Sequence, residues 1–173
     1  MKKKAAAVMS LVTCLLFAPV LVSAVDEDFA AYPECPFCGM DRQKFAHSRV
    51  FIEYEDDAEG FCSIHCAAID LAVKIDQTPK DIKVGDYNTK RLIDAEKAVW
   101  VIGGNKMGVM TKRAKWAFEK KEDAEKFVKE NGGKLSTFDE AMKATYEDMY
   151  ADTKMIRERR KARKMEQAPP PKK

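Results

Sequence analysis

After its first 24 residues, the 173-residue sequence has no apolar run long enough to cross a lipid bilayer. It also lacks a spacing typical of acid–base catalysis, because His47 has no evident carboxylate partner and the acidic residues 53–59 are typical of a solvated hairpin. The turn around Cys35 and Cys38 lacks the strand–helix–strand context of a thiol oxidoreductase. These absences predict a soluble mature chain that binds a ligand and is not an enzyme.

The first 24 residues have the features of a secretory signal peptide. Residues 2–4 are lysines, residues 5–22 are largely apolar, and small residues lead up to Ala24. Pro19 interrupts the apolar stretch, which favours cleavage after Ala24 over a retained membrane anchor. We therefore expect the chain to be exported to the periplasm, with no transmembrane segment after cleavage.

Cys14 raises the alternative of a lipoprotein signal. Thr13 stands before it, where lipoprotein signals prefer Gly or Ala, and the apolar stretch continues after it. The sequence favours a cleavable signal peptide over a lipid anchor at Cys14.

The net charge of +3 hides a strong asymmetry along the chain. Residues 25–153 carry 19 basic and 26 acidic side chains, a net charge of −7. Residues 154–173 carry nine basic and two acidic side chains. An acidic body with a basic tail is not the composition of a nucleic-acid binder, so we expect no nucleic-acid partner.

The order of predicted elements repeats once, after a polar leader over residues 25–34. The first set is a strand over 50–54, a hairpin loop over 55–60, a strand near Phe61, a helix over 63–76 with Ser63 as its N-cap, and a strand over 82–87. The second set begins with a strand over 98–102, a turn over 103–105, a strand over 116–118 and a helix over 122–130. Two tandem ββαβ modules, about 33–90 and 91–142, predict an α+β fold.

Residues 138–167 predict a long, heavily charged helix with a partial apolar stripe. The proline-rich end, 168–173, is expected to be disordered. The predicted organisation is therefore a signal peptide over 1–24, a metal-binding domain over 25–142, and a charged helix with a basic tail over 143–173.

All four cysteines after the signal peptide lie in a 32-residue window, as the pairs Cys35/Cys38 and Cys62/Cys66. A CxxC turn points both sulfurs at one volume, and residues four apart share one face of a helix. His65 lies on nearly the same face as Cys62. Three interpretations remain open from spacing: two disulfides, a structural zinc site, or a soft-metal site for Cu(I).

Methionines distinguish these interpretations in part. Met40 follows Cys38 by two residues, and Met107 and Met110 lie in the glycine-rich stretch 103–110. Methionines usually fill gaps in a core, but thioethers are also ligands for Cu(I), whereas zinc makes little use of them. Methionines in a glycine-rich loop, in a chain that has a cysteine cluster elsewhere, therefore favour copper.

Three stretches resemble the NosL family of nitrous-oxide-reductase accessory proteins: CPFCGMDRQKFAHSRVFIEYED, FCSIHCAAIDLA, and the long run from VWVIGGNKMGVM to LSTFDEA. The resemblance covers residues 33 to about 142. It implies paired ββαβ modules and a periplasmic or membrane-anchored Cu(I)-binding protein that supplies copper to the reductase. It also places the family's CGM motif at Cys38, Gly39 and Met40, and its methionine loop at residues 107–110.

Two features depart from the family pattern. Many members are lipoproteins, whereas Cys14 has no convincing lipobox, and the Cys62-x-x-His65-Cys66 element belongs to one branch and resembles small TRASH-like metal-binding domains. We predict a Cu(I) metallochaperone whose client is a copper protein such as nitrous oxide reductase or its maturation machinery. The alternatives are a structural-zinc or heavy-metal-binding interaction module, or a disulfide-bonded periplasmic protein. The predicted metal ligands are Cys35, Cys38, Met40, Cys62, His65, Cys66, Met107 and Met110.

Overall fold

The computed structural model describes residues 24–167. Residues 1–23 of the predicted signal peptide, including Cys14, and the predicted disordered end over 168–173 therefore lie outside the described residues. Among the described helices, none combines the length and the apolar character needed to cross a bilayer.

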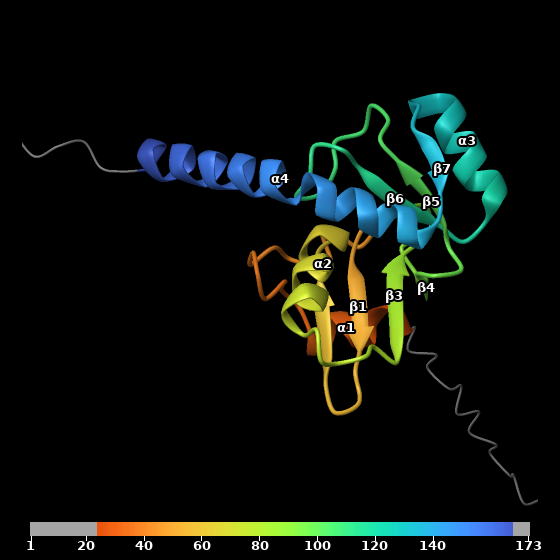
Figure 1. The fold of residues 1–173 in the computed structure, drawn as a ribbon, viewed down its shortest axis with the longest axis horizontal. Coiled ribbons are helices and arrows are strands. Elements are labelled where there is room, and N and C mark those ends of the chain that lie inside the picture. The colour runs from red at the N-terminus through yellow and green to blue at the C-terminus, as the bar shows by residue number, and fades with distance from the viewer. Residues whose placement is uncertain (1–23, 168–173) are drawn as a thin grey trace, which may run out of the picture.

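The first module forms a four-stranded antiparallel sheet (Figure 1). Its central strand β1 (Val50–Glu53) pairs with β2 (Ala58–Phe61) on one side and with β3 (Asp81–Gly85) on the other. Helix α2 (Ile64–Val73) connects β2 to β3 and packs against the sheet. Strand β4 (Leu92–Asp94) pairs with β3 and forms the edge of the sheet. The order β1, β2, α2, β3 is the predicted ββαβ order.

The second module repeats this arrangement in a three-stranded sheet. Strand β5 (Val99–Ile102) lies between β6 (Lys115–Phe118) and β7 (Lys134–Ser136), and α3 (Lys121–Asn131) connects β6 to β7. Because each module places its first strand between the other two, the tandem α+β fold is confirmed. The two domain boundaries inside the chain stay predictions.

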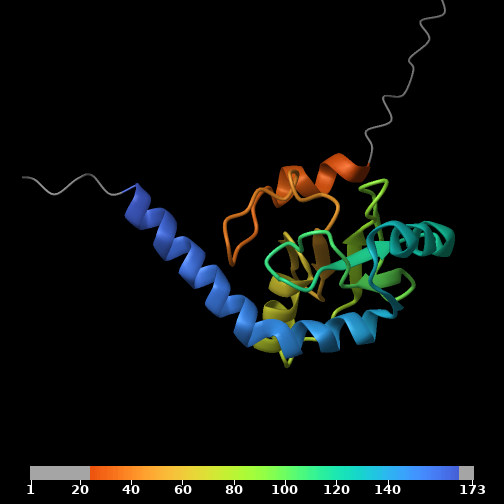
Figure 2. The same cartoon turned by 90° about the horizontal axis from the view of Figure 1, so that it is seen from above.

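Helix α4 (Phe138–Glu166) is the predicted long helix. Thr137 and Glu140 form a capping box at its start, which satisfies two backbone N–H groups there. Its first half packs on α2 and β5, and Tyr146 donates a hydrogen bond to the Ala68 carbonyl of α2 at 3.0 Å. Residues 157–167 are all exposed, and Figures 1 and 2 show this half of the helix continuing past both sheets.

Two local predictions need correction. The segment 25–34 is not simply a polar leader, because α1 (Ala24–Ala31) occupies most of it. Ser63 does occupy the N-cap of α2, but its side chain makes no capping hydrogen bond, and the helix ends at Val73, before Asp76.

Helix α1 is held by a buried charge cluster. Asp28 lies 2.8 Å from the Arg42 guanidinium and 2.9 Å from the Arg49 guanidinium, and both arginine side chains are fully buried. Arg42 also donates to the Phe61 carbonyl at 3.4 Å, directly before Cys62. The cluster therefore joins α1, the turn that carries the first cysteine pair, and the end of β2.

The two sheets share one core. Asp86 forms a parallel bridge with Ala117, so the chain after β3 lies along β6 of the second module. Tyr87 then packs against Trp116 and, edge to face, against His47. Burial lowers the pKa of His47, which is consistent with a packed, neutral imidazole.

Candidate metal centre

The sulfur atoms of the four cysteines converge from both halves of the first module. The Sγ atoms of Cys35, Cys38, Cys62 and Cys66 all lie within 4.8 Å of one another, with 3.4 Å between those of Cys38 and Cys62 and 3.7 Å between those of Cys62 and Cys66. A tetrahedral ion with metal–sulfur bonds of about 2.3 Å separates its sulfurs by about 3.8 Å. The four-sulfur group therefore fits around a single ion.

All four cysteines are free thiols in this structure. Their sulfur–sulfur distances are well above the roughly 2.05 Å of a disulfide bond. Four free thiols that face one another fit a zinc or a Cu(I) site. The structure contains no disulfide among these four cysteines.

A tight turn brings Cys35 and Cys38 together. The Cys35 N–H donates to the Met40 carbonyl at 3.0 Å, and the Gly39 N–H donates to the Cys35 carbonyl at 2.8 Å. Gly39 has a φ of +67°, a left-handed conformation that glycine adopts without steric cost. Glycine in the CGM step thus lets the chain reverse directly after Cys38.

The second cysteine pair spans the end of β2 and the start of α2. Cys62 follows the strand, and its carbonyl accepts a hydrogen bond from the Ser48 hydroxyl at 2.8 Å. Cys66 lies in the first turn of α2, and its backbone N–H donates to the Ser63 carbonyl at 3.1 Å. The i, i+4 spacing predicted from the sequence is therefore realised, with the strand-to-helix junction replacing a full helical turn.

Burial divides the four thiols into two kinds. Cys35, Cys62 and Cys66 are at most 1% exposed, whereas Cys38 is partly exposed. An ion held by all four sulfurs would therefore be reached through Cys38.

The thiols also change one another's protonation. Hydrogen bonding from Cys38, and then from the other two thiols, lowers the pKa of Cys35. Contact with Cys35 raises the pKa values of Cys62 and Cys66, and burial adds to both. The pKa values of the thiols are therefore shifted in opposite directions, and an ion that binds all four sulfurs must displace their protons.

The predicted methionines line a cleft that opens beside Cys38. The cleft has a volume of about 570 Å³, and its lining includes Cys38, Met40, Met107 and Met110. Met40 and Met110 are half-buried, whereas Met107 is 77% exposed at the rim. Met155 of α4 lines the same cleft and was missed by sequence reasoning, because nothing in its own helix marks it as near the cysteines.

The loop that carries Met110 holds this residue in an unusual conformation. Met110 has a φ of +62°, which costs a residue with a side chain roughly 1–2 kcal/mol. Gly108 is required nearby, because a Cβ there would lie 2.8 Å from the Thr111 carbonyl oxygen. Such a conformation persists only where surrounding contacts enforce it, and it is commonest at functional sites.

Comparison with known proteins identifies the family of this chain. The profile of the NosL family matches residues 27–146, which is most of the chain. The chain belongs to the NosL family. The crystal structure of the copper chaperone NosL from Shewanella denitrificans matches it with a TM-score of 0.49 and 27% identity, over 62% of this chain and 87% of that chain. No curated protein sequence matches.

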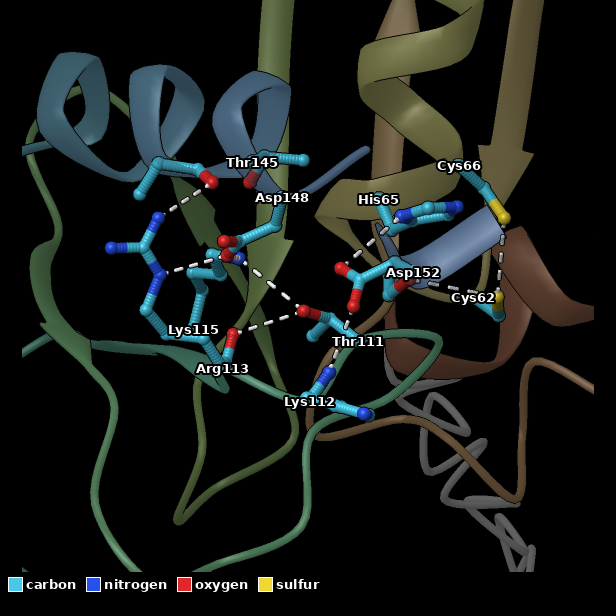
Figure 3. A network of polar contacts seen from close by, with 12 residues as sticks. Cys62, His65, Cys66, Thr111, Lys112, Arg113, Lys115, Thr145, Asp148 and Asp152 are labelled. Carbon is cyan, nitrogen blue, oxygen red and sulfur yellow. Dashed lines mark hydrogen bonds and ion pairs between the residues drawn. The ribbon is translucent and has the colours of Figure 1, made fainter. Parts of the chain in front are cut away.

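His65 is not among the residues of the four-sulfur group in this NosL-family chain, and Figure 3 shows its ring beside Asp152. Its Nδ1 lies 3.9 Å from the Asp152 carboxylate of α4, and both side chains are almost fully buried. Burial lowers the pKa of His65, so its imidazole is neutral at neutral pH. His65 thus lies at the contact between α2 and α4, where it also lines a small pocket with Cys38 and Cys66, and its role as a ligand stays a prediction.

Polar contacts tie the methionine loop of the NosL-family chain to α4 (Figure 3). Asp152 accepts a hydrogen bond from the Lys112 backbone at 3.1 Å, and Asp148 accepts from Lys115 at 2.6 Å and from Arg113 at 2.8 Å. These contacts fix the loop against the helix on the side where His65 meets Asp152. The relative position of the cysteine and methionine groups thus depends on α4.

Proposed function

We propose that this protein is a periplasmic Cu(I)-binding metallochaperone, which holds the ion among cysteine and methionine sulfurs and passes it to a copper protein. One observation carries the proposal. Cys38 belongs both to the four-sulfur group and to the methionine-lined cleft. A buried thiol site thus continues into an open thioether site through a shared ligand.

The donor set favours Cu(I). Thiolates bind both Cu(I) and zinc, but thioethers are soft ligands that bind Cu(I) and are not among the usual zinc ligands. The cleft beside Cys38 offers Met40, Met110 and Met155, and Met107 stands at its rim. Thioethers stay neutral at any periplasmic pH, so they bind the ion without competing with protons.

The unequal burial of the thiols suggests the order of transfer. Cys35, Cys62 and Cys66 are closed to an incoming protein, whereas Cys38 is partly exposed and Met107 is exposed at the rim of the cleft. A ligand of the acceptor first binds the ion on this open side, and the buried thiolates then release it. Each step exchanges one ligand for another, no electron moves, and each released thiolate takes up a proton.

The acceptor that we propose is a copper enzyme such as nitrous oxide reductase, or its maturation machinery. This choice rests on membership of the NosL family. We assign metal binding and transfer to this protein, and no catalysis, because the spacing of the four sulfur atoms suits the coordination of one ion.

A structural zinc site is the second candidate, because the spacing of the four sulfurs suits one tetrahedral ion. The two functions differ in what removal of the metal does. Structural zinc supplies folding free energy, so the domain would unfold without it, whereas a chaperone must stay folded when empty.

The test is an anaerobic titration of residues 25–173 with Cu(I) against a competing chelator, with zinc in parallel. We expect Cu(I) to bind far more tightly than zinc. The variant with Cys38, Cys62 and Cys66 all changed to Ser should lose Cu(I) and keep its circular dichroism spectrum. Wild-type Cu(I) affinity in this variant would show that the site is assigned wrongly.

A further inference from the structure

The second half of α4 carries charge that the rest of the structure does not neutralise. Residues 154–164, which we call the basic arm, contain seven basic residues and one acidic residue, Glu158. Within residues 24–167, none of these basic side chains forms an ion pair, whereas Arg113 and Lys115 in the body both pair with Asp148. The arm also lies beyond residue 146, where the match to the NosL family ends.

The basic arm lies at the mouth of the metal centre. Arg159, Arg160 and Arg163 line the same cleft as Cys38 and Met110. Arg160 also donates a hydrogen bond to the Cys38 carbonyl at 3.0 Å. Figure 2 shows the loop before β1 (orange) and the loop between β5 and β6 (green) on the same side of α4. Anything that reaches the sulfurs from this side must therefore pass these arginines.

Helix stability alone does not account for the arm. Cations in the last turn interact favourably with the helix dipole, which explains Arg163 and Lys164 but not the basic residues one and two turns earlier. A membrane-surface helix would need an apolar face, and residues 157–164 contain a single apolar residue, Ala162. A charged helical segment without an apolar face is suited to an electrostatic contact.

We propose that the basic arm is the docking site for a carboxylate-rich segment of the acceptor protein, which it guides to Cys38. This inference rests on the proposed function of metal transfer. Arginine guanidinium groups bind carboxylates through paired hydrogen bonds, which fix orientation as well as position. The body over residues 25–153 has a net charge of −7, so its overall field opposes an acidic partner, whereas the arm attracts one. The difference in charge between the body and the arm therefore orients the cleft beside Cys38 toward the acceptor.

Two synthetic peptides serve as probes. Each contains a pair of methionines as Cu(I) ligands, flanked by glutamates in one peptide and by glutamines in the other. Fluorescence anisotropy measures their binding to the copper-free protein, and stopped-flow spectroscopy measures Cu(I) transfer from the loaded protein. The test variant is Arg159→Gln with Arg163→Gln, which keeps Arg160 on the Cys38 carbonyl. The matched control is Lys120→Gln with Lys129→Gln, two exposed lysines at α3.

We expect the wild-type protein to bind the glutamate peptide and not the glutamine peptide, with an affinity that falls as salt is added. The arginine variant should bind the glutamate peptide about tenfold more weakly and receive less benefit from low salt, whereas the lysine control should change by less than about twofold. Because Arg159 and Arg163 line the cleft, Cu(I) affinity is measured in all three proteins, so that a change in transfer rate is separated from a change in metal binding.

Three results would overturn the docking proposal: equal binding of the two peptides, equal losses in the arginine variant and the lysine control, or binding to phosphatidylserine vesicles without binding to the glutamate peptide. Failure of the proposed function gives a different result. In that case the protein would not bind Cu(I), while the anisotropy measurement on the copper-free protein would still report the acidic partner.

Discussion

Replacing Asp28 by Asn tests whether the buried charge cluster under the cysteine turn is as important as its geometry indicates. The carboxylate is the acidic partner of both Arg42 and Arg49, at 2.8 and 2.9 Å, and both guanidinium groups are shielded from water. Asn keeps the size and one acceptor oxygen but removes the negative charge. Two buried positive charges then face each other without compensation.

The expected loss of stability is large. Removing one partner of a buried ion pair typically costs about 3–5 kcal/mol, because the remaining charge stays desolvated. Asn retains part of the hydrogen bonding, so we expect about 3 kcal/mol for Asp28→Asn. Since domains are stable by roughly 5–15 kcal/mol, this is a substantial fraction of the total, and it corresponds to a melting temperature about 10 °C lower.

Urea unfolding followed by tryptophan fluorescence measures this loss, because Trp100 and Trp116 are both buried. The matched control is Glu55→Gln, which removes a pair with Lys80 whose acidic side chain is 81% exposed. That change should cost less than about 1 kcal/mol. If Asp28→Asn costs no more than the control, the reasoning about the buried cluster is wrong.

Three further predictions concern the metal centre. Changing Met107 and Met110 to Leu nearly conserves volume, so folding should change little while Cu(I) affinity or transfer rate falls about tenfold with zinc affinity unchanged; the same change at Met142 and Met149, outside the cleft, should leave copper binding intact. Removal of metal with a chelator should leave one cooperative unfolding transition in calorimetry, and its loss would favour structural zinc. Asp152→Ala should lower the free energy of unfolding by about 1–3 kcal/mol and speed hydrogen exchange of the Lys112 backbone amide, which donates a hydrogen bond to the Asp152 carboxylate. Unchanged exchange would show that this contact does not hold the methionine loop.

Local patterns were sufficient for most of the secondary structure. Alternation predicted β1, helical spacing predicted α2 and α3, and the order of elements predicted the repeat. Strand β4 was missed because three residues are too few to show a period, and it forms through pairing with β3. Helix α1 was missed because its stability comes from contacts that Asp28 makes with residues far along the chain.

The sequence by itself determined which atoms are available for the metal. They belong to two close cysteine pairs, a CGM step and a methionine loop, and each of these motifs is short enough to be recognised from adjacent residues. Only the tertiary structure decided how they combine. It brought the four sulfurs within 4.8 Å of one another and placed His65 beside Asp152. It also placed Met155 and the arginines of the basic arm in the cleft beside Cys38. The four sulfurs meet because the first cysteine turn packs against the end of β2, where Arg42 donates to the Phe61 carbonyl. The positions of His65, Met155 and the basic arm depend on the packing of α4 against α2 and β5. Both contacts join residues too far apart in the sequence for any local pattern to connect.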